Sequence, residues 1–150
     1  MQKFMKSAIV QAQKSFQKDE VPIGAVVVKD GKVLSRAYNT RNASQNAINH
    51  AEILAISKAC KKLKSWRLET CDIYVTLEPC PMCAGAILNA RIKNLYFGAY
   101  DKTSKTNILN TIMQDDRLNH KTNVIGGVMQ EECSKLLTDF FSAKRKEKNK

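Results

Sequence analysis

The stretch Pro79-Cys80-Pro81-Met82-Cys83 lies between an apolar run at residues 73–77 and an apolar segment at residues 81–90. Proline is favoured at the first position of a helix, so Pro81 predicts Cys80 as the N-cap residue. Cys83 then lies three residues further on, on the same side of the first turn. The positive end of the helix dipole lowers thiol pKa values, and the thiolate is the form that binds metal. The stretch therefore predicts a strand, a turn and a helix that presents two thiolates.

The segment His50-Ala51-Glu52 supplies a third ligand and a carboxylate. It precedes a helical stripe formed by Ile53, Ile56, Cys60 and Leu63. Catalytic zinc sites keep three protein ligands and leave the fourth position to water, which matches a set made of His50, Cys80 and Cys83. His120 is interpreted as a surface or substrate-side group. Glu52 does not share a face with His50 in a regular helix, but at the helix mouth it can reach back and take a proton from metal-activated water.

The rest of the chain alternates between helical and strand patterns. Helical spacing predicts a first helix that ends near Lys18 and a last helix over residues 133–141. Apolar runs predict strands at 23–28, 73–77 and 95–99. Alternation predicts a returning strand at 33–38, and Asp30-Gly31 predicts a hairpin turn before it. Residues 101–107 are expected to be a loop, and residues 124–125 a short strand or part of a loop. These elements predict one α/β domain over residues 1–150, with helices on both faces of the sheet and a frayed basic tail at 144–150.

Composition bears on partners and compartment. The 150 residues include 25 basic and 14 acidic side chains, for a formal net charge of +11. Such a charge attracts polyanions, of which nucleic acid is the usual one, although a general bias towards lysine would also produce it. We find neither a run of about 20 apolar residues nor a signal-peptide core, so we expect a cytoplasmic protein. Five cysteines, an odd number, argue against a disulfide framework, and Cys60, Cys71 and Cys133 are interpreted as buried or free thiols.

The two metal-ligand segments together resemble the signature of the zinc deaminases. Further stretches resemble the bacterial tRNA-specific adenosine deaminases within the cytidine deaminase-like superfamily, and the likeness runs from about Ala8 to Lys146. They are Val21-Pro22-Ile23-Gly24-Ala25-Val26, residues 74–86, Phe97-Gly98-Ala99 and Asp139-Phe140-Phe141.

The resemblance implies a three-layer α/β/α fold with a central mixed sheet of about five strands. It also implies hydrolytic deamination of adenosine to inosine at the wobble position of a tRNA anticodon, with arginine tRNA as the expected substrate. Zinc-activated hydroxide would attack C6 of the adenine, and Glu52 would move protons to N1 and to the leaving ammonia. Zn²⁺ would be held by His50, Cys80 and Cys83, and the enzyme would be a homodimer.

The resemblance further implies contacts with the anticodon stem-loop. The residues expected to make them are Asn39, Asp101, Phe140, Phe141, Lys144 and Arg145. Each also has a plainer interpretation, because Asn39 can simply end a strand, Asp101 can be a turn residue, and at least one of the two phenylalanines is expected in the core. The loops at residues 46–49 and 102–107 depart from the family pattern, which leaves their nucleotide contacts open.

Other functions remain open at this stage. Cys80 and Cys83 also fit a redox pair, but that interpretation leaves His50 and Glu52 unexplained. A guanine, cytidine or deoxycytidylate deaminase would share the zinc signature, although such an enzyme has no need of a +11 charge. A zinc-stabilised RNA-binding module without catalysis would bind RNA but release no ammonia.

Overall fold

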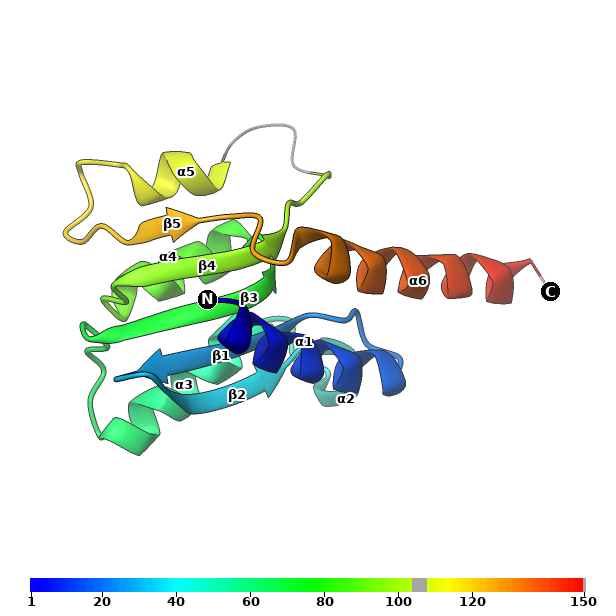
Figure 1. Ribbon diagram of the computed structural model, residues 1–150, viewed down its shortest axis with the longest axis horizontal. Helices are drawn as coiled ribbons and strands as arrows, with labels where there is room; N and C mark the ends of the chain where they lie inside the picture. Colours follow the sequence, from blue (N-terminus) through cyan, green and yellow to red (C-terminus); the bar gives the residue numbers. More distant parts are fainter. Residues whose placement is uncertain (104–107, 150) are drawn as a thin grey trace.

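A mixed five-stranded sheet forms the centre of the molecule in the computed structural model, which describes residues 1–103 and 108–149. The strand order is β2-β1-β3-β4-β5. β1 (Gly24–Lys29) pairs antiparallel with both β2 (Lys32–Tyr38) and β3 (Cys71–Leu77). β4 (Asn94–Ala99) runs parallel to β3, and β5 (Asn123–Ile125) runs parallel to β4 (Figure 1). Residues 124–125 are thus part of a short strand.

The hairpin between β1 and β2 has the predicted two-residue turn. Lys29 pairs with Lys32, and the two residues between them have φ values of 51° at Asp30 and 73° at Gly31. Positive φ at both central positions matches the right-handed twist of the flanking strands, and Asp-Gly is well suited to it. The turn therefore sets the pairing of the residues next to it, and the register shifts once further along, between Val28 and Val27.

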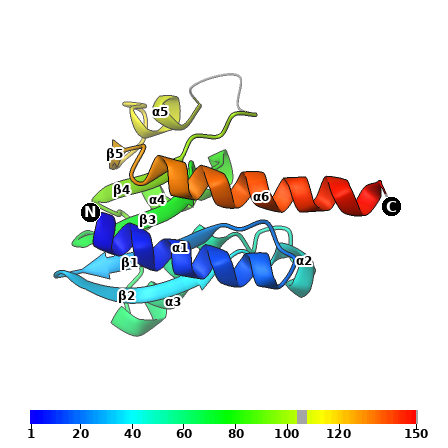
Figure 2. The same cartoon turned by 45° about the vertical axis from the view of Figure 1, so that its right-hand side comes forward.

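Helices cover both faces of the sheet, so the predicted three-layer arrangement is confirmed. α1 (Gln2–Gln17) and α6 (Gln130–Lys148) pack on one face over Val26, Val28 and Tyr74 (Figures 1 and 2). α3 (Ala51–Leu63), α4 (Pro81–Asn89) and α5 (Ile108–Met113) pack on the other, over the larger core. A short helix, α2 (Arg41–Ser44), lies in the connection between β2 and α3.

Three details differ from the sequence-based expectations. The buried face of α3 runs through Ala51, Ala55 and Ala59 beside Ile56, and the predicted stripe residue Ile53 is only partly buried. The basic segment predicted to be frayed is helical in α6 as far as Lys148. Neither α2 nor α5 was predicted. The expected loop over residues 101–107 lies partly outside the described residues, at 104–107. In the part of the chain that the structure describes, none of the helices combines the length and apolarity needed to cross a bilayer.

Candidate metal centre

Three potential metal ligands meet where α3 and α4 begin. His50 and Cys80 are the N-cap residues of these helices, and both have extended backbone. His50 Nδ1 lies 3.7 Å from Cys80 Sγ and 3.6 Å from Cys83 Sγ. All three ligand atoms lie within 4.8 Å of one another. The residues singled out from two separate segments thus form one cluster.

The spacing of these atoms fits a tetrahedral cation. With Zn–N near 2.05 Å and Zn–S near 2.3 Å, the edge of a tetrahedron between nitrogen and sulfur is about 3.6 Å. Both His50–cysteine distances agree with this edge. A set of one imidazole and two thiols is also the donor chemistry that zinc prefers.

The two thiols share a hydrogen bond that separates their pKa values. The bond from Cys83 stabilises the Cys80 thiolate and lowers its pKa to about 5, and the dipole at the start of α4 acts in the same direction. The same bond, together with burial, raises the pKa of Cys83. Cys80 is therefore ready to bind a cation as the thiolate.

Glu52 lies in the first turn of α3, beside this cluster. Its side chain is buried, at 4% exposure, and burial raises its pKa to about 7, while its own backbone amide partly offsets the shift. A hydrogen bond to Cys83 places the carboxyl group next to a candidate ligand. A general acid or base works best when its pKa lies near the working pH. This carboxyl group can therefore both accept and give up a proton at neutral pH.

The sequence and the fold are similar to those of known proteins. The chain matches the family described as MafB19-like deaminase over residues 1–145. The tRNA-specific adenosine deaminase of Bacillus subtilis (strain 168) is 49% identical over 146 residues, which cover 97% of this chain and 91% of that protein. The chain belongs to the tRNA-specific adenosine deaminase family. The enzyme of the same name from Haemophilus influenzae is 41% identical over 98% of this chain and 86% of its own length.

Solved structures agree with membership of this adenosine deaminase family. A structure from a study of A-to-I editing by tRNA:A34 deaminases superposes with a TM-score of 0.85 at 39% identity, covering 91% of this chain and 100% of that chain. A guanine deaminase from Bacillus subtilis has a TM-score of 0.63 at 40% identity, covering 65% of this chain and 63% of that chain. The predicted cytidine deaminase-like fold is confirmed.

Three of the residues for which the family resemblance implies RNA contacts line one pocket. Asp101, Phe141 and Arg145 border a pocket of about 490 Å³ between the end of β4 and α6. Phe141 is 45% exposed, and Arg145 is exposed as well. The Asp101 carboxylate accepts bonds from the amide and hydroxyl of Thr103, which makes it a turn residue as well.

The other three expected RNA contacts lie elsewhere. Asn39 is buried, at 7% exposure, and its side-chain oxygen accepts the amide N–H of Arg41. Phe140 is also buried, with its ring edge-on to Phe16, so it belongs to the core as expected of one of the two phenylalanines. Lys144 pairs with Asp19, at a distance of 2.5 Å.

Other side chains complete the picture of the site. A ring nitrogen of His120 lies 2.9 Å from the Ile92 carbonyl oxygen, away from the metal cluster. Two carboxylates beside the site were not predicted from the sequence. Glu78 accepts the amide N–H of Asp101, and Glu20 accepts two amides at the start of α2. Both contacts join segments more than 20 positions apart, which local patterns do not reveal.

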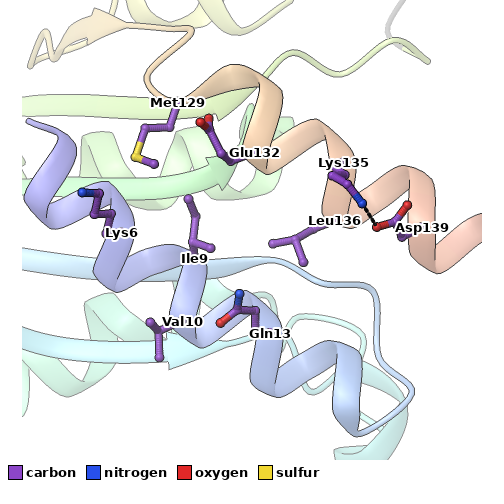
Figure 3. A pocket seen from close by; sticks show the side chains of 9 residues that line it. All are labelled: Lys6, Ile9, Val10, Gln13, Met129, Glu132, Lys135, Leu136 and Asp139. Carbon is purple, nitrogen blue, oxygen red and sulfur yellow. Dashed lines mark hydrogen bonds and ion pairs between the residues drawn. The ribbon is translucent and has the colours of Figure 1, made fainter.

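A further groove lies between α1 and α6, on the face of the sheet opposite α3 and α4 (Figure 3). Ile9, Val10 and Leu136 are among the residues that line it, and two further lining residues, Lys135 and Asp139, form an ion pair. Because α3 and α4 carry the metal cluster on the other side of the sheet, this groove is separate from the candidate active site.

Proposed function

We propose that this chain deaminates adenosine to inosine at the wobble position of a tRNA anticodon, with arginine tRNA as its substrate. The observation that carries the proposal is the cluster of His50, Cys80 and Cys83 beside the buried Glu52. Near-full-length identity to tRNA-specific adenosine deaminases supports the choice of substrate. Hydrolysis at C6 of adenine needs a polarised water and a group that carries its proton to the base.

In the proposed mechanism His50, Cys80 and Cys83 would hold Zn²⁺, which would supply the Lewis acidity that activates water at neutral pH. Glu52 does the proton transfer. Its carboxylate would take a proton from the attacking water and deliver it to N1 of the adenine. It would then take the proton of the new hydroxyl group at C6 and pass it to the amino group, which leaves as ammonia. The raised pKa of Glu52, about 7, suits both directions of transfer.

RNA contacts are proposed for the side chains around the pocket beside α6. Phe141 is exposed and free to stack on a base, whereas the buried Phe140 supports it through an edge-to-face contact with ring centroids 5.4 Å apart. Arg145 and Lys144 would neutralise phosphates, and Asp101 would meet a flanking nucleotide. Asn39 would contact the flipped adenosine through a short movement, because its amide now bonds within the protein.

We also propose that the enzyme is a cytoplasmic homodimer. Apolar side chains remain exposed near the metal cluster, which is where a partner subunit could complete the pocket. They include Ile48, Met82 and Ile108. Covering an exposed apolar patch is a common reason for association.

The decisive experiment compares four substrates with the unaltered protein and with Glu52→Ala. We expect one ammonia and one inosine per arginine tRNA, and little turnover of free guanine, cytidine or deoxycytidylate. Glu52→Ala should lower kcat by about 10²- to 10⁴-fold with zinc retained. Preferential turnover of guanine would instead favour the small-substrate alternative. Part of the chain is also similar to a guanine deaminase.

Three further outcomes would count against the proposal. RNA binding without ammonia release would indicate the non-catalytic zinc module. An unchanged rate in Glu52→Ala would show that another group moves the protons. In cells, inosine retained in the anticodon of arginine tRNA after loss of this protein would reject the physiological role.

A further inference from the structure

A buried carboxylate outside the metal cluster accepts hydrogen bonds from the loop that leads to His50. Glu20 is 2% exposed and lies in the connection between α1 and β1. Its Oε2 accepts the amide N–H of Asn42 at 3.1 Å, and its Oε1 accepts that of Ala43 at 3.0 Å. Burying a carboxylate is costly unless both oxygens find donors, and charge-assisted bonds of this kind are strong. Glu20 is therefore satisfied only while the start of α2 stays in this position.

This loop, residues 40–49, connects two residues of the proposed site. It begins after Asn39 and ends at His50, and the amide of Thr40 bonds the Asn49 carbonyl at 3.2 Å to close its base. The position of this loop therefore affects the positions of Asn39 and His50, which flank it.

The segment that carries Glu20 also touches the other proposed RNA contacts. The Val21 carbonyl accepts a bond from the side-chain amide of Asn39 at 3.4 Å, and Val21 itself lines the pocket shared by Phe141 and Arg145. Asp19, the preceding residue, pairs with Lys144 of α6. Residues 19–21 thus contact Asn39, the loop before His50 and the helix beside the pocket.

We infer that Glu20 is a positioning residue for the proposed deamination: its two hydrogen bonds to Asn42 and Ala43 hold the loop at residues 40–49 and so set Asn39 relative to His50. The inference rests on the proposed function for its effect on turnover. The two hydrogen bonds that Glu20 accepts are a property of the fold and can be tested without substrate. Glu20 touches neither substrate nor metal in this role, so its effect should appear mainly in substrate affinity.

Glu20→Gln is the direct test, because it keeps the size of the side chain but leaves only one oxygen to accept the two amides. In the zinc-loaded, full-length protein we expect amide hydrogen exchange at Asn42 and Ala43 to accelerate at least tenfold. We expect kcat/KM on an anticodon stem-loop to fall about 10- to 100-fold, with most of the change in KM and zinc stoichiometry unchanged. Glu69→Gln, which removes an exposed partner of Arg67, serves as the matched control and should change neither quantity.

Two results would overturn the inference. One is unchanged exchange at Asn42 and Ala43, which would show that Glu20 does not hold the loop. The other is faster exchange with kcat and KM both unchanged per folded, zinc-loaded chain, which would reduce Glu20 to a stability role. Should Glu20→Gln not fold, Glu20→Asp keeps the charge with a shorter reach and carries the same two measurements. Absence of turnover in the unaltered protein would count against the proposed function alone. The exchange measurement would still show whether Glu20 holds the loop.

Discussion

Burial raises the pKa of two side chains in this protein, with different chemical consequences at the two sites. At Glu52 burial raises the pKa to about 7, which makes the carboxyl group useful for proton transfer. At Cys133, on α6, burial is also the main cause, but here it raises the pKa to about 12 and keeps the thiol neutral. The first residue lies beside a candidate metal site and the second is packed in the core, so the same physical effect gives reactivity in one place and inertness in the other.

The pKa of Cys133 predicts how stability depends on alkaline pH. The unfolded thiol titrates near 9.0 and the folded one near 12, so above pH 9 only the unfolded chain loses the proton. The free energy of unfolding should therefore fall as pH rises, by up to about 1 kcal/mol per pH unit between pH 9 and 12. Urea unfolding at pH 7.5, 9 and 10.5 measures it, with Cys133→Ala as the comparison. Equal pH slopes in the two proteins would contradict the assignment to Cys133.

Residue-scale features were predictable where the signal is local in the sequence. Pro81 at the first helical position and the three-residue spacing of the cysteines place Cys80 and Cys83 without knowledge of the fold. The bonds of Glu20 to Asn42 and Ala43 span 22 and 23 positions, and no local pattern announces them. Only the folded chain shows which buried carboxylate braces the site.

At the scale of elements, close approach between helices and the sheet decides details that hydrophobic periodicity misses. The buried face of α3 is made largely of alanine, so the helix can lie close to β1 and β2, and the larger Ile53 turns partly outward. Periodicity weights large apolar residues and therefore predicted the wrong centre for this face. The apolar runs that predicted β1 and β3 were reliable because these two central strands bury both of their faces.

Gly24 marks the closest approach of this kind, between β1 and α1. A Cβ at this position would lie 2.1 Å from the Ala8 oxygen and 2.5 Å from the Ala12 nitrogen, which are both backbone atoms of α1. Gly24→Ala should therefore push the helix off the sheet and destabilise the protein by about 3 kcal/mol or more. Gly85→Ala is the matched control, because a Cβ there meets nothing within 4 Å, and it should stabilise α4 by about 0.5–1 kcal/mol. Urea unfolding of both variants measures the change in the free energy of unfolding. A small decrease for Gly24→Ala would show that α1 can move away from the sheet at little cost.

At the scale of the whole molecule, charge and shape act together. The net charge of +11 is spread over the chain, but α6 extends beyond the edge of the sheet with Lys144, Arg145, Lys146 and Lys148 in its last two turns (Figures 1 and 2). Sequence composition predicted a polyanionic partner, yet it could not predict that the basic segment is a helix that continues the wall of the pocket at Phe141. A preformed helix loses less conformational entropy on binding RNA than a frayed tail would.

The electrostatic contribution predicts a steep dependence of activity on salt. Each phosphate contact releases counterions, so log(kcat/KM) for an anticodon stem-loop should fall linearly with log[salt], whereas turnover of a neutral free base should not. Arg145→Ala should make that slope shallower by about one, since it would remove the one phosphate contact proposed for Arg145, which lines the pocket. Lys135→Ala is the control, because Lys135 is paired with Asp139 beside the separate groove between α1 and α6, and it should leave the slope unchanged. Steady-state rates from 50 to 200 mM salt provide the measurement. A slope that Arg145→Ala and Lys135→Ala reduce equally would mean that general charge, and not the position of Arg145 on α6, guides the RNA to the site.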